Sequence, residues 1–198
     1  MPPIYLPAPH SAFRQGELLA NFFEHRAVGP ARDLTTEPVI DPPPFQPYQH
    51  PWLIVLTPDC DLDQDYKVRV PDEAEALRPD FEQRRGRRLI EHVMLCPGFL
   101  QSEIRGRLAP GSGIWDGVRN NQNVRYHRVE GGVIASTEDR VPELFVDFSR
   151  VFTIPASGLY GALESATVRR VAVTPPVYVH ALIQRFFAFQ SRIGLPDE

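Results

Sequence analysis

Four aspartates stand at every second position directly after a continuously apolar run of the chain. They are Asp59, Asp61, Asp63 and Asp65, with Cys60 between the first two. In an extended segment these carboxylates would point to one side and repel one another unless a cation or arginines neutralised them. A metal or small-ligand site is one interpretation, and its candidate residues are Asp59, Cys60, Asp61, Asp63 and His92. The glycine and glutamate of a calcium loop are missing, so a turn whose Asp side chains bond loop amides is the alternative.

Cys60 could act as a nucleophile or a zinc ligand, but its surroundings favour neither role. Negative neighbours raise the pKa of a thiol and so disfavour the thiolate. The other potential partners, Cys96, His92 and His127, do not stand at the spacing of a zinc motif. A small residue packed where a strand meets a loop is the alternative. We expect no cofactor.

Arginines supply the candidates for contact with nucleic acid. Of the 21 basic residues only Lys67 is a lysine, and 25 acidic residues leave a net charge of −4, so no global field draws the chain to nucleic acid. The arginines of segment 84–88 form either a solvated helix face that also neutralises the acidic segment, or a phosphate-contacting patch. A second candidate lies in the amide-rich segment 120–127. The nucleic-acid candidates are Arg84, Arg85, Arg87, Arg88 and Arg125.

Segment 177–193 has apolar residues at helical spacing, after two prolines and before a glycine, which predicts a C-terminal amphipathic helix. Its phenylalanines pack in the core or dock a partner. The partner-binding candidates are Phe186, Phe187, Phe189 and Arg192.

The elements that must position these residues are mostly short strands. Residues 52–57 are continuously apolar, which predicts a strand buried on both faces, and 89–96 reads as its neighbour. Further strands are expected at 144–154 and 167–174, a hairpin at 124–135, and either a strand or a helix at 16–25. A solvent-covered helix is expected within 71–88, and short helices at 99–108 and 157–163. We therefore predict a mainly β, β-rich α+β fold, with a small twisted barrel.

The 198 residues allow one domain, with 42% hydrophobic residues and 21 prolines. We expect an extended arm at 1–12, a barrel over 14–174 and the C-terminal helix. The barrel would carry a proline-rich insertion at 29–51 and a charged insertion at 66–88. No apolar run reaches the roughly 20 residues that span a membrane, and no signal peptide pattern is present. With two cysteines, we expect a cytoplasmic protein without a membrane partner.

Three segments in order resemble the PemK/MazF family, whose fold is an SH3-like barrel. Arg14–Leu19 (RQGELL) is similar to the family's opening basic-Gly-acid strand, His50–Thr57 (HPWLIVLT) to its RPVLVLS strand, and Val93–Gly98 (VMLCPG) to its VVCPIT strand. More loosely, Leu144–Leu159 resembles a later strand followed by a short helix. The Cys-Asp-Leu motif at 60–62 is also similar to bacterial proteins without an assigned activity.

The resemblance implies a barrel and, in members that cut RNA, an arginine before the proline of the second strand and a threonine after the next strand. This chain has His50 at the first position and Gly98 and Phe99 at the second, with Ser102 close by. A neutral histidine stabilises a phosphorane less than an arginine does, although it could serve as an acid or base. A ribonuclease would use His50, Arg14 and Ser102.

Three functions follow from these patterns. The first is a non-catalytic interaction or regulatory module that binds an operon-encoded protein partner in a bacterial toxin–antitoxin or defence-type system. That context rests on the resemblance, and the proline-rich segment and the terminal helix are the expected docking surfaces. The second is a divergent endoribonuclease that binds RNA. The third is a metal- or ligand-binding protein that uses the Asp-rich segment.

Overall fold

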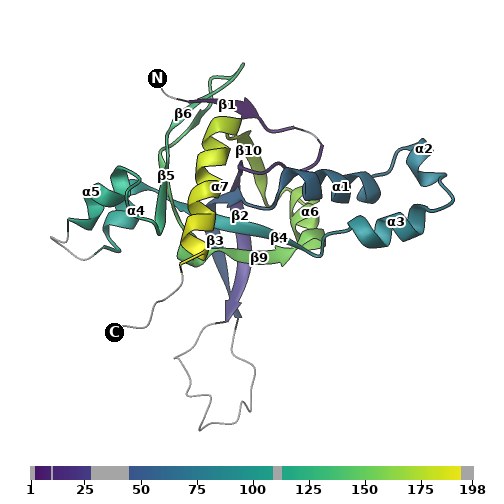
Figure 1. Ribbon diagram of the computed structural model, residues 1–198, viewed down its shortest axis with the longest axis horizontal. Helices are drawn as coiled ribbons and strands as arrows, with labels where there is room; N and C mark the ends of the chain where they lie inside the picture. The colour runs from purple at the N-terminus through teal and green to yellow at the C-terminus, as the bar shows by residue number, and fades with distance from the viewer. Residues whose placement is uncertain (1–2, 10, 28–44, 109–112, 193–198) are drawn as a thin grey trace, which may run out of the picture.

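The structure, a computed structural model, describes residues 3–9, 11–27, 45–108 and 113–192 (Figure 1). Within these residues one ten-stranded mixed sheet has the order β5-β8-β4-β3-β2-β10-β1-β6-β7, and β9 pairs with β4. The strands are β1 (Ile4–Pro7), β2 (Glu17–Ala27), β3 (Phe45–Val55), β4 (His92–Phe99), β5 (Tyr126–Val129), β6 (Gly132–Ile134), β7 (Arg140–Val141), β8 (Leu144–Asp147), β9 (Phe152–Pro155) and β10 (Arg169–Val173).

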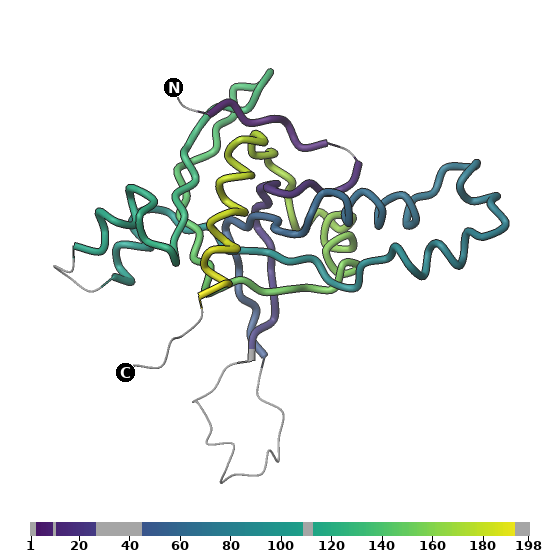
Figure 2. Tube along the Cα trace, viewed as in Figure 1, coloured from purple at the N-terminus to yellow at the C-terminus, as the bar shows by residue number. Residues whose placement is uncertain are grey.

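Helices flank this sheet, so the fold is mixed α/β with a predominance of strands. They are α1 (Asp59–Arg69), α2 (Glu73–Ala76), α3 (Phe81–Arg88), α4 (Gln101–Arg105), α5 (Ile114–Arg119), the 3-10 turn η1 (Phe148–Arg150), α6 (Ala156–Glu164) and α7 (Pro176–Gln190). The α1–α3 segment projects from one side of the body, and α4 and α5 lie on the other side (Figures 1 and 2). No helix in the described ranges has the length and apolar character that a membrane crossing requires.

The predicted central pair of strands is confirmed. Strands β3 and β4 are antiparallel neighbours, with Ile54 opposite Cys96 and Leu53 opposite Pro97. Ile54 and Cys96 belong to the core layer under α7, which contributes Leu182 and Phe186. Leu53 and Val55 belong to the opposite layer, which includes residues of α1 and α6. Both faces of the apolar run at 52–57 are therefore buried, as its lack of polar alternation indicates.

The sheet does not close into the small SH3-like barrel that the sequence predicted, because its two terminal strands, β5 and β7, do not pair. The predicted hairpin at 124–135 is also wrong. Strand β5 pairs with β8 and strand β6 with β1, near opposite ends of the order. A Cβ at Gly132 would overlap the carbonyl oxygen of Pro3, so this glycine serves the close approach of β1 rather than a tight turn. Within the predicted arm, β1 is thus an integral strand, paired with β6 and β10.

Strand assignments along the rest of the chain are partly corrected. Segment 16–25, which could have been a strand or a helix, is strand, and β2 pairs with β3 from Leu18 opposite Ile54 to Ala27 opposite Phe45. The predicted proline-rich loop 29–51 therefore ends earlier, and its portion 28–44 lies outside the described residues. Pro47 and Pro51 are tolerated because β4 joins β3 only from Trp52 onwards.

The predicted strand 144–154 is interrupted. The Asp147 carboxylate accepts hydrogen bonds from the Ser149 backbone N–H at 3.1 Å and its hydroxyl at 2.7 Å. These bonds compete with the ladder and form η1, so that β8 and β9 pair with different parts of β4.

The acidic run is a helix, and neither the extended segment nor the turn considered from the sequence is present. Helix α1 begins after Pro58, with Asp59 and Asp61 in its first turn and Lys67 and Arg69 in its last. It buries Leu62, Asp65 and Val68 at spacings of three. The helix expected at 71–88 is divided into α2 and α3 around Pro79. The C-terminal helix, predicted over 177–193, is confirmed as α7.

Candidate functional site

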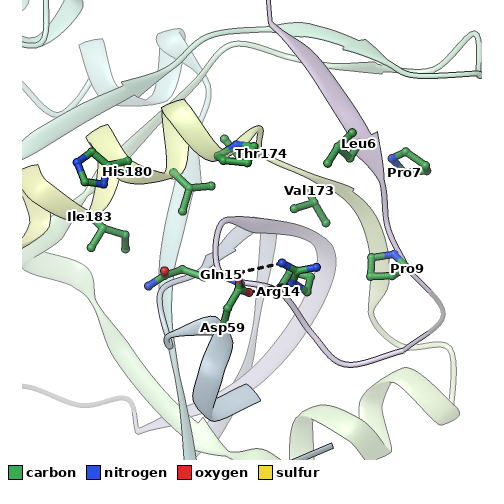
Figure 3. A pocket seen from close by; sticks show the side chains of 12 residues that line it. Leu6, Pro7, Pro9, Arg14, Gln15, Asp59, Val173, Thr174, His180 and Ile183 are labelled. Carbon is green, nitrogen blue, oxygen red and sulfur yellow. Dashed lines mark hydrogen bonds and ion pairs between the residues drawn. The ribbon is translucent and has the colours of Figure 1, made fainter. Parts of the chain in front are cut away.

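The candidate functional site is a pocket of about 350 Å³ at the junction of β1, β10 and the first half of α7 (Figure 3). Its walls combine aliphatic and proline side chains with a short polar rim. It is lined by Leu6, Pro7, Pro9, Arg14, Gln15, Asp59, Val173, Thr174, Pro176, Val179, His180 and Ile183. This size is at the lower end of the roughly 300–1,000 Å³ range of ligand pockets.

A two-pronged ion pair forms the polar rim. Arg14 donates from Nε to Asp59 Oδ1 and from a terminal nitrogen to Oδ2, both at 3.0 Å. The backbone N–H of Gln15 also donates to Asp59 Oδ1, at 2.7 Å. Burial raises the pKa of Asp59, but these bonds outweigh it and lower the pKa below its ordinary value. The pair is fixed in geometry, yet its side chains remain 51% and 46% exposed.

Gly16 brings α7 close enough to complete the pocket. It has φ +79°, and a Cβ on it would overlap the Cγ2 methyl of Val179. Its carbonyl accepts bonds from Thr174 N at 3.1 Å and from Thr174 Oγ1 at 2.7 Å. The turn after Arg14 is therefore anchored to β10 and packed directly against the first half of α7.

The described lining residues bring no hydroxyl or thiol nucleophile next to a base. Thr174 carries the one hydroxyl among the lining residues. This hydroxyl is buried and donates a hydrogen bond to the carbonyl oxygen of Gly16. His180 Nε2 lies 2.8 Å from Gln184 Nε2 and contacts no hydroxyl or thiol. A nucleophile bonded to a base, which covalent catalysis requires, is thus absent from the lining.

The ribonuclease candidates are held in separate networks. Arg14 is bound to Asp59, whereas His50 is buried in β3 with Nε2 at 2.7 Å from Glu24 Oε2. The His50 ring stacks on Phe152, with ring centroids 5.0 Å apart. Burial lowers the pKa of His50 although Glu24 acts in the opposite direction. Ser102 lies on α4, and none of the hydrogen bonds among described residues joins it to Arg14 or His50.

The metal candidates are not assembled. Because segment 59–65 is helical, Asp59, Asp61 and Asp63 do not share one face. Asp63 binds Lys67 at 2.6 Å. Cys60 is exposed and directs its sulfur at Asp61, at 3.4 Å. The described residues contain no group of three or more His, Cys, Asp or Glu side chains that could hold a metal ion.

The arginines of α3 are largely paired within their own segment. Arg84 and Arg88 lie 3.1 and 3.9 Å from Glu75 of α2, and Arg85 lies 3.8 Å from Glu82. Arg87 is exposed. Arg125 stands apart from them, bound to Asp147 at the end of β8, so the five nucleic-acid candidates do not form one surface.

The predicted docking residues of the last helix divide between core and surface. Phe186 is buried, and Phe189 packs against the same core layer. Phe187 is 63% exposed, and Arg192 lies over the Phe189 ring with its guanidinium carbon 6.0 Å from the centroid. Sequence reasoning instead missed Val179, His180 and Ile183, one to two turns earlier, because no local pattern separates the pocket wall from the rest of the helix.

No family model, curated protein or solved structure matches the chain. The resemblance to the PemK/MazF family therefore stays a prediction.

Proposed function

We propose that the protein is a non-catalytic interaction module that binds an extended segment of a protein partner in this pocket. The pocket's combination of aliphatic walls with the rim pair of Arg14 and Asp59 carries the proposal. A peptide group offers one donor and one acceptor. The exposed faces of the pair offer a carboxylate for the N–H and a guanidinium for the C=O, while the walls take an aliphatic side chain.

The charge balance of the rim favours a peptide over an ion. Arg14 and Asp59 cancel each other, so a free anion or cation gains little from entering, whereas a neutral chain with both donors and acceptors is matched. Leu6, which lines the pocket, is 48% exposed and adds apolar surface that a partner would cover. A partner encoded beside this chain in a toxin–antitoxin or defence-type operon is the further proposal that the family resemblance motivates.

Isothermal titration calorimetry of the protein with each product of the genes beside its own tests the proposal. Leu6→Asp places a charge on the apolar wall at a side chain that is 48% exposed, so the fold should tolerate it. Leu77→Asp, on a side chain that is 75% exposed beyond α2, is the control. We expect one gene product to bind, Leu6→Asp to weaken it at least about tenfold, and Leu77→Asp to leave it unchanged.

Equal affinity of the three proteins for that partner would refute the pocket as its site. RNA cleavage by the wild type that is lost in His50→Ala would refute the non-catalytic role and favour the ribonuclease.

A further inference from the structure

Three arginines gather around two aromatic rings beside η1, away from the pocket. The guanidinium carbon of Arg107 lies 3.9 Å from the centroid of the Phe99 ring, and that of Arg150 lies 5.8 Å from the same centroid. Arg125 lies over the adjacent Tyr126 ring, at 5.0 Å. Three arginines spread over more than forty residues of sequence thus bring three positive charges to one place.

The carboxylate among these arginines is that of Asp147, and it already accepts hydrogen bonds from other groups. Asp147 is buried and accepts two bonds from Arg125, at 2.8 and 2.7 Å, and two from Ser149. Arg150 is more distant, with Nε 3.6 Å from Asp147 Oδ2. Arg107 forms no ion pair with any residue in the described ranges. The nearby acid Glu103 bonds to the backbone of Leu100. The cluster therefore keeps an excess of positive charge.

The pKa of the Tyr126 hydroxyl responds to all three arginines of this cluster. Burial raises the pKa of its hydroxyl and Asp147 adds to the rise, while Arg125, Arg150 and Arg107 all act to lower it. All three guanidinium groups are therefore close enough to act on one phenol.

The exposed edges of these groups are suited to an oxyanion. Arg125 and Arg150 are each 44% exposed. A guanidinium over a ring can keep N–H groups available for bonds to oxygen. Arg125 uses its Nε and one terminal nitrogen on Asp147, which leaves its second terminal nitrogen for an oxyanion. The α3 arginines differ, because Glu75 and Glu82 already neutralise most of them.

We propose that Arg107, Arg125 and Arg150 form a binding site for a phosphate group, either free phosphate or the monoester of a small ligand. Three guanidinium groups can share the oxygens of one phosphate, which relieves their mutual repulsion. The Phe99 and Tyr126 rings are buried, so the site recognises the phosphate and offers no platform for a stacked base. This site goes beyond the proposed function and does not depend on it.

Calorimetric titration of the full chain with inorganic phosphate, AMP and adenosine, at ionic strength fixed with sodium chloride, tests the site. Arg107→Ala and Arg150→Gln are the informative variants because neither strips the buried Asp147 of its main partner. Arg87→Ala removes an exposed arginine of α3 and is the matched control. We expect saturable binding of phosphate or AMP, weakened about tenfold by each informative variant, as for the loss of one charge-assisted hydrogen bond.

The ligands distinguish the source of the phosphate. Tighter binding of AMP assigns the site to phosphate esters, and tighter binding of inorganic phosphate assigns it to the free ion; adenosine should not bind in either case. The proposal is overturned if neither phosphate ligand binds above the chloride background. It is equally overturned if Arg107→Ala and Arg150→Gln bind like the wild type, or if Arg87→Ala loses as much affinity as they do.

Discussion

Replacing Gly16 with alanine tests the packing of α7 that creates the pocket. The residue has φ +79°, and an added Cβ would overlap the Val179 side chain and lie 3.4 Å from Thr174 Cβ. The backbone cannot move away easily, because Gly16 N donates to Val55 O at 2.8 Å and its carbonyl holds Thr174. Left-handed strain costs about 1 kcal/mol and overpacking about 1–3 kcal/mol. We therefore expect Gly16→Ala to lower the free energy of unfolding by about 3 kcal/mol.

Urea unfolding of four variants separates the two contributions. Val179→Ala in the Gly16→Ala background removes the overlap, so the double variant should be more stable than the sum of the single changes predicts, by about 1–2 kcal/mol. Gly86→Ala is the control, because no atom lies within 4 Å of a Cβ there, and in helix α3 it should be neutral or stabilising by up to about 1 kcal/mol. A change below about 0.5 kcal/mol for Gly16→Ala, or simple additivity with Val179→Ala, would refute the reasoning.

Two further predictions concern titration and reactivity. Burial, with a smaller contribution from Arg185, lowers the pKa of His127 from its ordinary 6.5 to about 4. The unfolded chain therefore binds this proton first, and the free energy of unfolding should fall by up to about 3 kcal/mol as pH drops from 6.5 to 4. His127→Gln should lose that part of the pH dependence, and an unchanged dependence in urea titrations would contradict it. Burial also raises the pKa of the Cys96 thiol, whereas Cys60 is exposed. A thiol reagent at pH 8 should therefore modify one cysteine quickly in the native protein and both in denaturant, and two fast thiols would contradict this.

The sequence was informative wherever one local pattern decides the outcome. The apolar run at 52–57 has no polar alternation, so burial on both faces followed directly, and two prolines before an apolar stripe located α7. The acidic run misled because its period of two resembles a strand. The burial of Leu62, Asp65 and Val68 is a helical spacing that the charges concealed. Asp65 is buried because it binds Arg69 and the backbone of Ile90, which no local pattern reveals.

Long-range packing explains the other differences. The paired glycines at 131–132 are the usual signal of a tight turn, but Gly132 is needed because Pro3, just before β1, approaches it closely. The same segment departs from the predicted hairpin, since β6 pairs with the N-terminal strand β1 instead of with β5. Arg14 was a candidate only for the ribonuclease alternative, and its partner in the structure, Asp59, lies 45 residues away. The pocket draws its walls from both ends of the chain, so composition and spacing could not locate it.

Photo-crosslinking from the wall of the pocket tests the proposed function most directly. A benzophenone amino acid placed at position 180, which lines the pocket, is compared in the native host with the same probe at position 187, an exposed site two turns further along α7. We predict one protein adduct from position 180 that is lost when Leu6→Asp is added, and no such adduct from position 187. An adduct from position 187 alone, or one from position 180 that Leu6→Asp leaves intact, would contradict the pocket as the partner's binding site.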